Sequence, residues 1–210
     1  MPAVSETIVR EYFETLGFLV QQPRKYIVMA RSKRPTEEVD FLAVHPQDTE
    51  APALPEADQM VVSGPQLRQV PRVMISLRGW HTDKISPATL DLAPEIFRFT
   101  EEGAVREALR VVGPGPLAKV LCLPGLPSSP ALAAQTLIKL RENGVDYVVL
   151  FPTMLRELVR HVEVSNNYEK SELLQTLRIL KNYDLLKDEQ LELFRRKAAP
   201  RNKAGKETAS

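Results

Sequence analysis

An aspartate inside an apolar, strand-like segment is the first candidate for a functional group. Asp40 lies in the segment Val39-Asp40-Phe41-Leu42-Ala43-Val44, whose β-branched and aromatic residues indicate a strand. A carboxylate is disfavoured in such a segment unless it lies at an edge, forms a pair or belongs to an active site. Asp40 is therefore interpreted as a site residue.

A second strand-like segment ends in polar side chains that are two residues apart. Residues 73–77 are apolar except for Ser76, and Arg78 follows them. Residues two apart in a strand project from the same face, so Ser76 and Arg78 are expected to share one side. The arginine could contact a phosphate there, and a solvated strand end would show the same pattern.

Several other chemistries lack support in the sequence. The segment Gly113-Pro114-Gly115-Pro116 has neither the lysine of a P-loop nor the spacing of a dinucleotide fingerprint, and its prolines lack amide donors. No serine lies in a nucleophile elbow. The single cysteine, Cys122, has no partner for an internal disulfide and lies in an apolar strand. The three histidines lie on separate elements without metal-ligand spacing: His45, His81 and His161.

The charge of the chain is unevenly distributed. Residues 195–210 hold six basic residues and one acidic residue, and the first 194 residues hold 22 basic and 26 acidic residues, a net charge of −4. That balance does not fit a domain that grips a long duplex by its phosphates. The basic tail is expected to be disordered, with a non-specific nucleic-acid arm as the alternative. A basic cluster before Asp40 could line a nucleic-acid path or form a charged hairpin turn: Arg24, Lys25, Arg31, Lys33 and Arg34.

Hydrophobic periodicity predicts the elements that position these residues. A helix begins near Val4 and ends at Gly17. Helices and strands then alternate, with a proline-rich loop or insertion at residues 45–72. The predicted strands are 18–20, 26–29, 39–44, 73–77, 118–123 and 145–151, and the predicted helices are 94–99, 101–111, 130–141, 153–164 and 170–186.

A strand, a helix and a strand at the end of the core imply a parallel crossover. The sequence therefore predicts an α/β fold with a mixed central sheet flanked by helices. We expect a core at residues 1–152, a C-terminal helical extension at 153–194 and a disordered basic tail at 195–210. No apolar run approaches the roughly 20 residues of a membrane span and no signal pattern is present, so a cytoplasmic protein without a membrane partner is expected.

The order of a helix with Glu6, a hairpin strand with Asp40, strand 73–78 and a further helix resembles the core of the PD-(D/E)XK, or restriction endonuclease-like, nuclease superfamily. That superfamily includes Holliday-junction resolvases and Mrr-type enzymes. Its helix acid, strand aspartate and Glu-x-Lys motif converge on a divalent metal, which polarises the phosphate and activates a water. The resemblance covers roughly residues 5–151. It implies Mg²⁺ ligation by Glu6 and Asp40, with Glu11 or Glu14 as alternatives to Glu6.

The third motif departs from the superfamily. Ser76 and Arg78 stand where the superfamily has Glu and Lys. Serine is a poor ligand for a hard dication, and arginine stays protonated. The resemblance thus implies a degenerate, inactive nuclease-like domain without a cofactor, which binds nucleic acid or a nucleic-acid-processing protein. Its expected nucleic-acid contacts are Lys33, Arg34 and Arg78.

Two other interpretations stay open. One is a Mg²⁺-dependent nuclease in which another acid, such as Glu38, replaces the missing ligand. The other is an α/β interaction protein without a nucleic-acid role. The sequence leaves the oligomeric state open.

Overall fold

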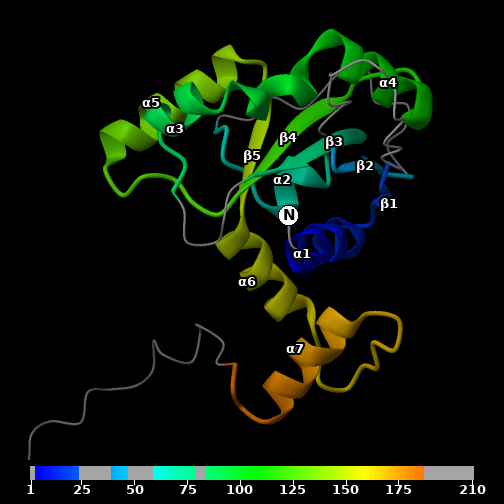
Figure 1. The fold of residues 1–210 in the computed structure, drawn as a ribbon. Coiled ribbons are helices and arrows are strands. Elements are labelled where there is room, and N and C mark those ends of the chain that lie inside the picture. Colours follow the sequence, from blue (N-terminus) through cyan, green and yellow to red (C-terminus); the bar gives the residue numbers. More distant parts are fainter. Residues whose placement is uncertain (1–2, 24–38, 47–58, 79–83, 187–210) are drawn as a thin grey trace, which may run out of the picture.

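Five strands form one mixed sheet in the computed structural model, which describes residues 3–23, 39–46, 59–78 and 84–186. The strands lie in chain order from β1 to β5 (Figure 1). β1, β2 and β3 pair antiparallel, whereas β3, β4 and β5 run parallel, as the crossover rule predicts. The strands are β1 Leu19–Gln21, β2 Phe41–Val44, β3 Arg72–Leu77, β4 Ala118–Leu123 and β5 Tyr147–Leu150.

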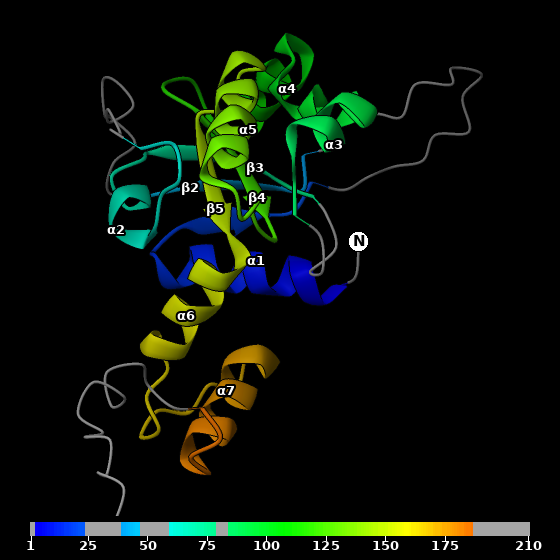
Figure 2. The same ribbon diagram turned by 90° about the vertical axis from the view of Figure 1, so that its left-hand side faces the viewer.

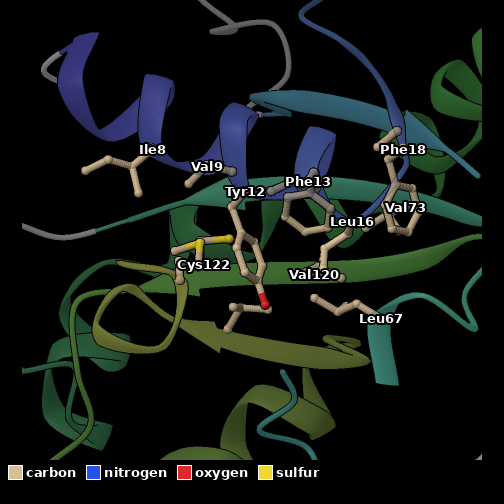
Figure 3. Close-up of a cluster of buried hydrophobic side chains, with 14 of the residues drawn as sticks. Ile8, Val9, Tyr12, Phe13, Leu16, Phe18, Leu67, Val73, Val120 and Cys122 are labelled. Carbon is tan, nitrogen blue, oxygen red and sulfur yellow. The ribbon is translucent and has the colours of Figure 1, made fainter. Parts of the chain in front are cut away.

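Helix α1, Ala3–Thr15, covers one face of the sheet. Its apolar residues recur at helical spacing and join β3 and β4 in a buried cluster (Figure 3). Gly17 has a φ of 96°, a conformation that glycine adopts without strain, and it turns the chain from the helix into β1. The cluster includes Ile8, Val9, Tyr12, Phe13, Leu16, Val73 and Val120.

The other face is covered by the helices that connect the parallel strands (Figure 1). Because alternate strand residues point to opposite faces, Met74 and Leu121 face this second cluster while their neighbours face α1. Both faces of β3 and β4 are thus buried, which explains their mostly apolar sequence. The helices are α3 Pro87–Leu92, the 3₁₀ helix η1 Pro94–Thr100, α4 Glu102–Val112 and α5 Pro130–Glu142. The predicted α/β class, a mixed sheet flanked by helices, is confirmed.

Helix α3 was not predicted from the periodicity. Its start carries a local signal, because Ser86 precedes Pro87 and the Ser86 hydroxyl accepts a hydrogen bond from the Thr89 N–H at 3.2 Å. The helix predicted at residues 94–99 is the 3₁₀ helix η1. Both segments are short, so they hold too few turns for a hydrophobic period to be detected.

The described part of the proline-rich segment belongs to the core. Residues 59–72 contain the short helix α2, Gly64–Leu67, and a parallel bridge between Val61 and Val148 of β5. Its buried apolar side chains include Met60, Val62, Leu67 and Val70. This part of the predicted loop or insertion is therefore packed against the sheet.

The C-terminal helices pack on the α1 side of the sheet (Figure 1). Helix α6, Phe151–His161, and helix α7, Glu172–Asn182, bury apolar residues in the same cluster as α1. The Lys181 ammonium donates to the carbonyls of Val159 and Val162, both at 2.9 Å, and so satisfies the C-terminal end of α6. No helix among the described residues has the length and apolar character needed to cross a bilayer. The predicted tail at 195–210 lies outside the described residues.

Candidate functional site

Asp40 lies immediately before β2, where the regular pairing of β2 with β3 ends. The ladder ends at the pair Phe41 and Ile75, and the Asp40 N–H donates to the Ile75 carbonyl at 2.9 Å. Val39 and Leu42 belong to the same buried cluster although they are three residues apart. The alternation of a regular strand is therefore broken around Asp40, which lets its side chain turn toward the main chain of β3.

The Asp40 carboxylate is buried and accepts three hydrogen bonds at one oxygen. Its Oδ2 accepts from the Leu77 N–H at 2.8 Å, from Arg78 Nη1 at 3.3 Å and from the Ser76 hydroxyl at 3.4 Å. The carboxylate thus takes the place of a strand partner for Leu77. The cost of burying its charge is offset by the guanidinium.

Arg78 is held from two sides. Its Nη1 donates to the Leu77 carbonyl at 2.7 Å in addition to the Asp40 carboxylate. The backbone N–H of Arg78 donates to the Cys122 carbonyl at 3.1 Å. This bond continues the β3–β4 pairing past the end of β3. The side chains of Arg78 and Asp40 are 17% and 6% exposed, so this ion pair is largely removed from water. The guanidinium therefore has a fixed position beside the carboxylate.

Ser76 is fully buried in β3, and its side chain reaches the same oxygen of Asp40 as Arg78 does. The two residues thus lie on one side of the strand. Ser76 follows Met74 by two residues, which places it on the sheet face opposite α1. The hydroxyl contact is long, so the N–H of Leu77 and the guanidinium are the stronger partners of Asp40.

Glu6 reaches the same end of the sheet from α1. It is partly exposed, and its Oε2 accepts a hydrogen bond from Gln22 Nε2 at 3.0 Å. Gln21 pairs with Leu42, so Gln22 lies level with Phe41, next to Asp40. The strand order thus brings Asp40, Ser76 and Arg78 into contact. Glu6 lies on α1, which covers the other face of the sheet from Ser76, and its hydrogen bond is to Gln22.

The charge of Asp40 also affects the thiol of Cys122 on the neighbouring strand β4. Burial raises the pKa of the Cys122 thiol, and the negative charge of Asp40 raises it further. A neutral, fully buried thiol is a poor nucleophile. Cys122 is therefore an inert, buried thiol of β4.

The arrangement offers little to a divalent metal. Among the described residues, no group of three or more His, Cys, Asp or Glu side chains could hold a metal ion. Of the two carboxylates that the sequence proposed as ligands, Asp40 already accepts from three donors at Oδ2, and Glu6 accepts from Gln22. What the site can do is hold a guanidinium at the end of β3, where it could meet an anion.

Some predicted residues lie outside the described part of the chain. They include Lys33, Arg34 and Glu38, the acid proposed as a replacement ligand. Their predicted roles stay predictions.

A second, partly buried carboxylate was missed by the sequence reasoning. Glu157 of α6 accepts from the Tyr12 hydroxyl at 2.8 Å and, at the same oxygen, from the Gly64 N–H at 3.1 Å. Burial and the nearby Glu157 charge raise the pKa of Tyr12. A Cβ atom at Gly64 would lie 2.6 Å from Glu157 Oε2, so the glycine permits this close approach. The one sequence signal here is Ser63-x-x-Gln66, a helix-start pattern in which Gln66 Oε1 accepts from the Ser63 N–H at 3.2 Å.

Comparisons with protein-family models, with curated proteins and with solved structures find no match for this chain.

Proposed function

We propose that this chain is a degenerate, catalytically inactive nuclease-like domain of the PD-(D/E)XK type, with a binding or structural role in nucleic-acid processing. The observation that carries the proposal is the ion pair of Asp40 with Arg78. In the superfamily that the sequence resembles, the aspartate at this position binds a divalent metal. Here a permanently charged guanidinium lies beside the carboxylate instead.

The exchange of a metal for a guanidinium removes the chemistry of cleavage. A divalent cation lowers the pKa of a bound water and polarises a phosphate, whereas a guanidinium only donates hydrogen bonds and positive charge. Ser76, at the position of the missing glutamate, points its hydroxyl at Asp40. The site thus retains a cation that can face a phosphate and lacks groups that activate water.

The topology supports the same proposal. The chain places a helix before three antiparallel strands and then a helical connection to a fourth strand that is parallel to the third. The resemblance rests on part of this order, namely the helix with Glu6, the hairpin strand with Asp40, strand 73–78 and the helix that follows. The order also explains why Asp40, Ser76 and Arg78 meet although 36 residues separate the first two.

One observation favours a different function. The first 194 residues hold 22 basic and 26 acidic residues, so they carry a net charge of −4, which gives no general attraction to a polyanion. An α/β interaction protein without a nucleic-acid role is therefore the second candidate. Nucleic-acid binding must be measured separately from metal binding.

Calorimetric titration with Mn²⁺ and Mg²⁺ tests the inactive site. The parent is expected to show no saturable binding at millimolar metal. The double variant Ser76→Glu with Arg78→Lys rebuilds a carboxylate and a titratable amine beside Asp40 and should gain binding that Asp40→Asn abolishes. The control Ser128→Glu with Arg106→Lys makes the same charge change at exposed positions and should gain nothing. Saturable binding by the parent, with cleavage of DNA, would overturn the proposal.

Fluorescence anisotropy with labelled duplex and single-stranded DNA in EDTA tests the nucleic-acid role. The parent is expected to bind at low salt without a divalent metal, and Arg78→Gln should weaken binding about tenfold because one charged phosphate donor is lost. Absence of binding to both DNA forms at low salt would favour the interaction protein.

A further inference from the structure

The outer edge of the sheet on the β5 side is formed by a short segment, Met60 to Val62 (Figure 2). The Val62 N–H donates to the Val148 carbonyl at 3.0 Å, and the Val148 N–H donates to the Met60 carbonyl at 2.8 Å. Main-chain groups of successive strand residues point to alternate sides, so the N–H and C=O of Val61 point away from β5. This edge can accept another strand.

Helix α5 flanks this edge and leaves an apolar groove of about 640 Å³ between itself and the segment. The groove is lined by Met60, Val61, Leu137 and Ile138, with Arg141 and Glu142 at the end of the helix. Helix α5 buries only Thr136 and Leu140 completely. Ile138 is 57% exposed, which leaves an apolar side chain projecting beside the groove.

The sheet edge and the groove beside α5 can pair with the same edge and groove of a second copy. An identical edge, related by a two-fold axis, pairs with this one in antiparallel orientation without any change in the chain. The projecting Ile138 of one copy can fill the groove of the other. Arg141 and Glu142 have opposite charges and both line one end of the groove, so a two-fold axis that passes close to them can bring Arg141 of one copy to Glu142 of the other. A strongly charged partner finds no matching excess of charge in this groove.

We propose that the segment 59–62 and helix α5 form the interface of a symmetric homodimer, in which the two sheets join at their β5-side edges. The occupant of the groove is a second copy of this chain. The inference rests on the edge, the groove and the paired charges, and it is independent of the proposed nuclease-like function.

The molar mass in solution tests this inference. Size-exclusion chromatography with light scattering, at protein concentrations from about 1 to 100 μM, should give twice the 23.6 kDa mass of the chain. Ile138→Glu should weaken the dimer about tenfold or more, because it places a charge in the apolar contact. Ile179→Glu makes the same change on the exposed surface of α7 and should leave the dimer intact. Circular dichroism and thermal unfolding check that both variants are folded.

A charge exchange gives a second, independent readout. Arg141→Glu leaves only acidic side chains at positions 141 and 142 of both copies, and their repulsion across the axis should weaken the dimer. Combining Arg141→Glu with Glu142→Arg returns one acid and one base to each copy and should restore the dimer. A parent that is monomeric at 100 μM overturns the proposal, even if the groove binds another protein. A dimer that Ile138→Glu does not weaken also overturns it, because the copies then meet elsewhere.

Discussion

Two carboxylates tie distant parts of this chain together, and they are compensated in different ways. Asp40 faces the cation of Arg78 and the N–H of Leu77 at the end of the sheet. Glu157 faces two neutral donors, the Tyr12 hydroxyl and the Gly64 N–H, between α6, α1 and α2. In the first case two charges depend on each other, whereas in the second an amide could replace the carboxylate without leaving a charge unpaired. The contrast separates a site that holds a cation from a structural contact.

The sharpest test of this contrast is a pair of isosteric substitutions. Asp40→Asn removes the negative charge beside Arg78 and is expected to lower the free energy of unfolding by about 3 kcal/mol. Glu157→Gln keeps an acceptor for its neutral donors and should cost about 1 kcal/mol. Urea unfolding at pH 7 measures both losses. Equal losses would mean that the guanidinium does not depend on Asp40 in the way the structure indicates.

The Glu157 contact can be broken from its other side by Gly64→Ala. The new Cβ would lie 2.6 Å from Glu157 Oε2 and 2.8 Å from Leu16 Cδ2, so these side chains must move, at a cost of about 2 kcal/mol. Gly103→Ala is the matched control, because its Cβ meets nothing within 4 Å and lies in helix α4. It should be neutral or stabilise by up to about 1 kcal/mol. A neutral Gly64→Ala would show that the contact is not tight.

The pH dependence of Tyr12→Phe isolates the phenol that donates to Glu157. The pKa of Tyr12 is raised above its usual value of about 10, so the folded protein keeps this proton where the unfolded chain loses it. Its contribution to stability is therefore complete below about pH 10 and falls as the pH rises further. Tyr12→Phe should cost about 1 kcal/mol at pH 7 and lose stability less steeply above about pH 10. The free energies of unfolding of the parent and of Tyr12→Phe are measured at pH 7, 9, 10 and 11. If the phenol were not involved, both proteins would lose stability with the same slope above about pH 10.

The smallest effect is expected at Ser76, on the Asp40 side of the comparison. The Ser76 hydroxyl lies 3.4 Å from Asp40 Oδ2, which is a weak hydrogen bond. Ser76→Ala should therefore change the free energy of unfolding by about 0.5 kcal/mol and leave the Asp40–Arg78 pair in place. Chemical denaturation at pH 7 measures the change. A loss above about 2 kcal/mol would show that the hydroxyl is a main partner of Asp40.

Apolar patterning predicted most of the elements, because the pattern depends on neighbours two to four residues away. Residues 118–123 were predicted as a strand and form β4, and residues 101–111 were predicted as a helix and lie within one residue of α4 at each end. The short helices were missed or given the wrong helix type. Helix α2 lies among prolines, and α3 has six residues, so in both cases only the capping residues carried a signal.

The candidate site could be predicted only in part. Asp40 stood out because a carboxylate in a strand needs a partner, and the spacing of Ser76 and Arg78 placed both on one side of a strand. The contact of Arg78 with Asp40 spans 38 residues, so its geometry follows from strand pairing and not from local sequence. No local pattern distinguishes Glu157 from an ordinary helix surface residue.

The sequence by itself determined the α/β class, the main strands and helices and the residues at the end of β3. The tertiary structure decided that Asp40 faces a guanidinium, that Met60 to Val62 extend the sheet beyond β5 and that Glu157 meets Tyr12 across 145 residues. The reason is physical. Local conformation follows from nearby side chains, whereas the partner of a buried charge depends on which distant segments the packing of the sheet and helices brings together.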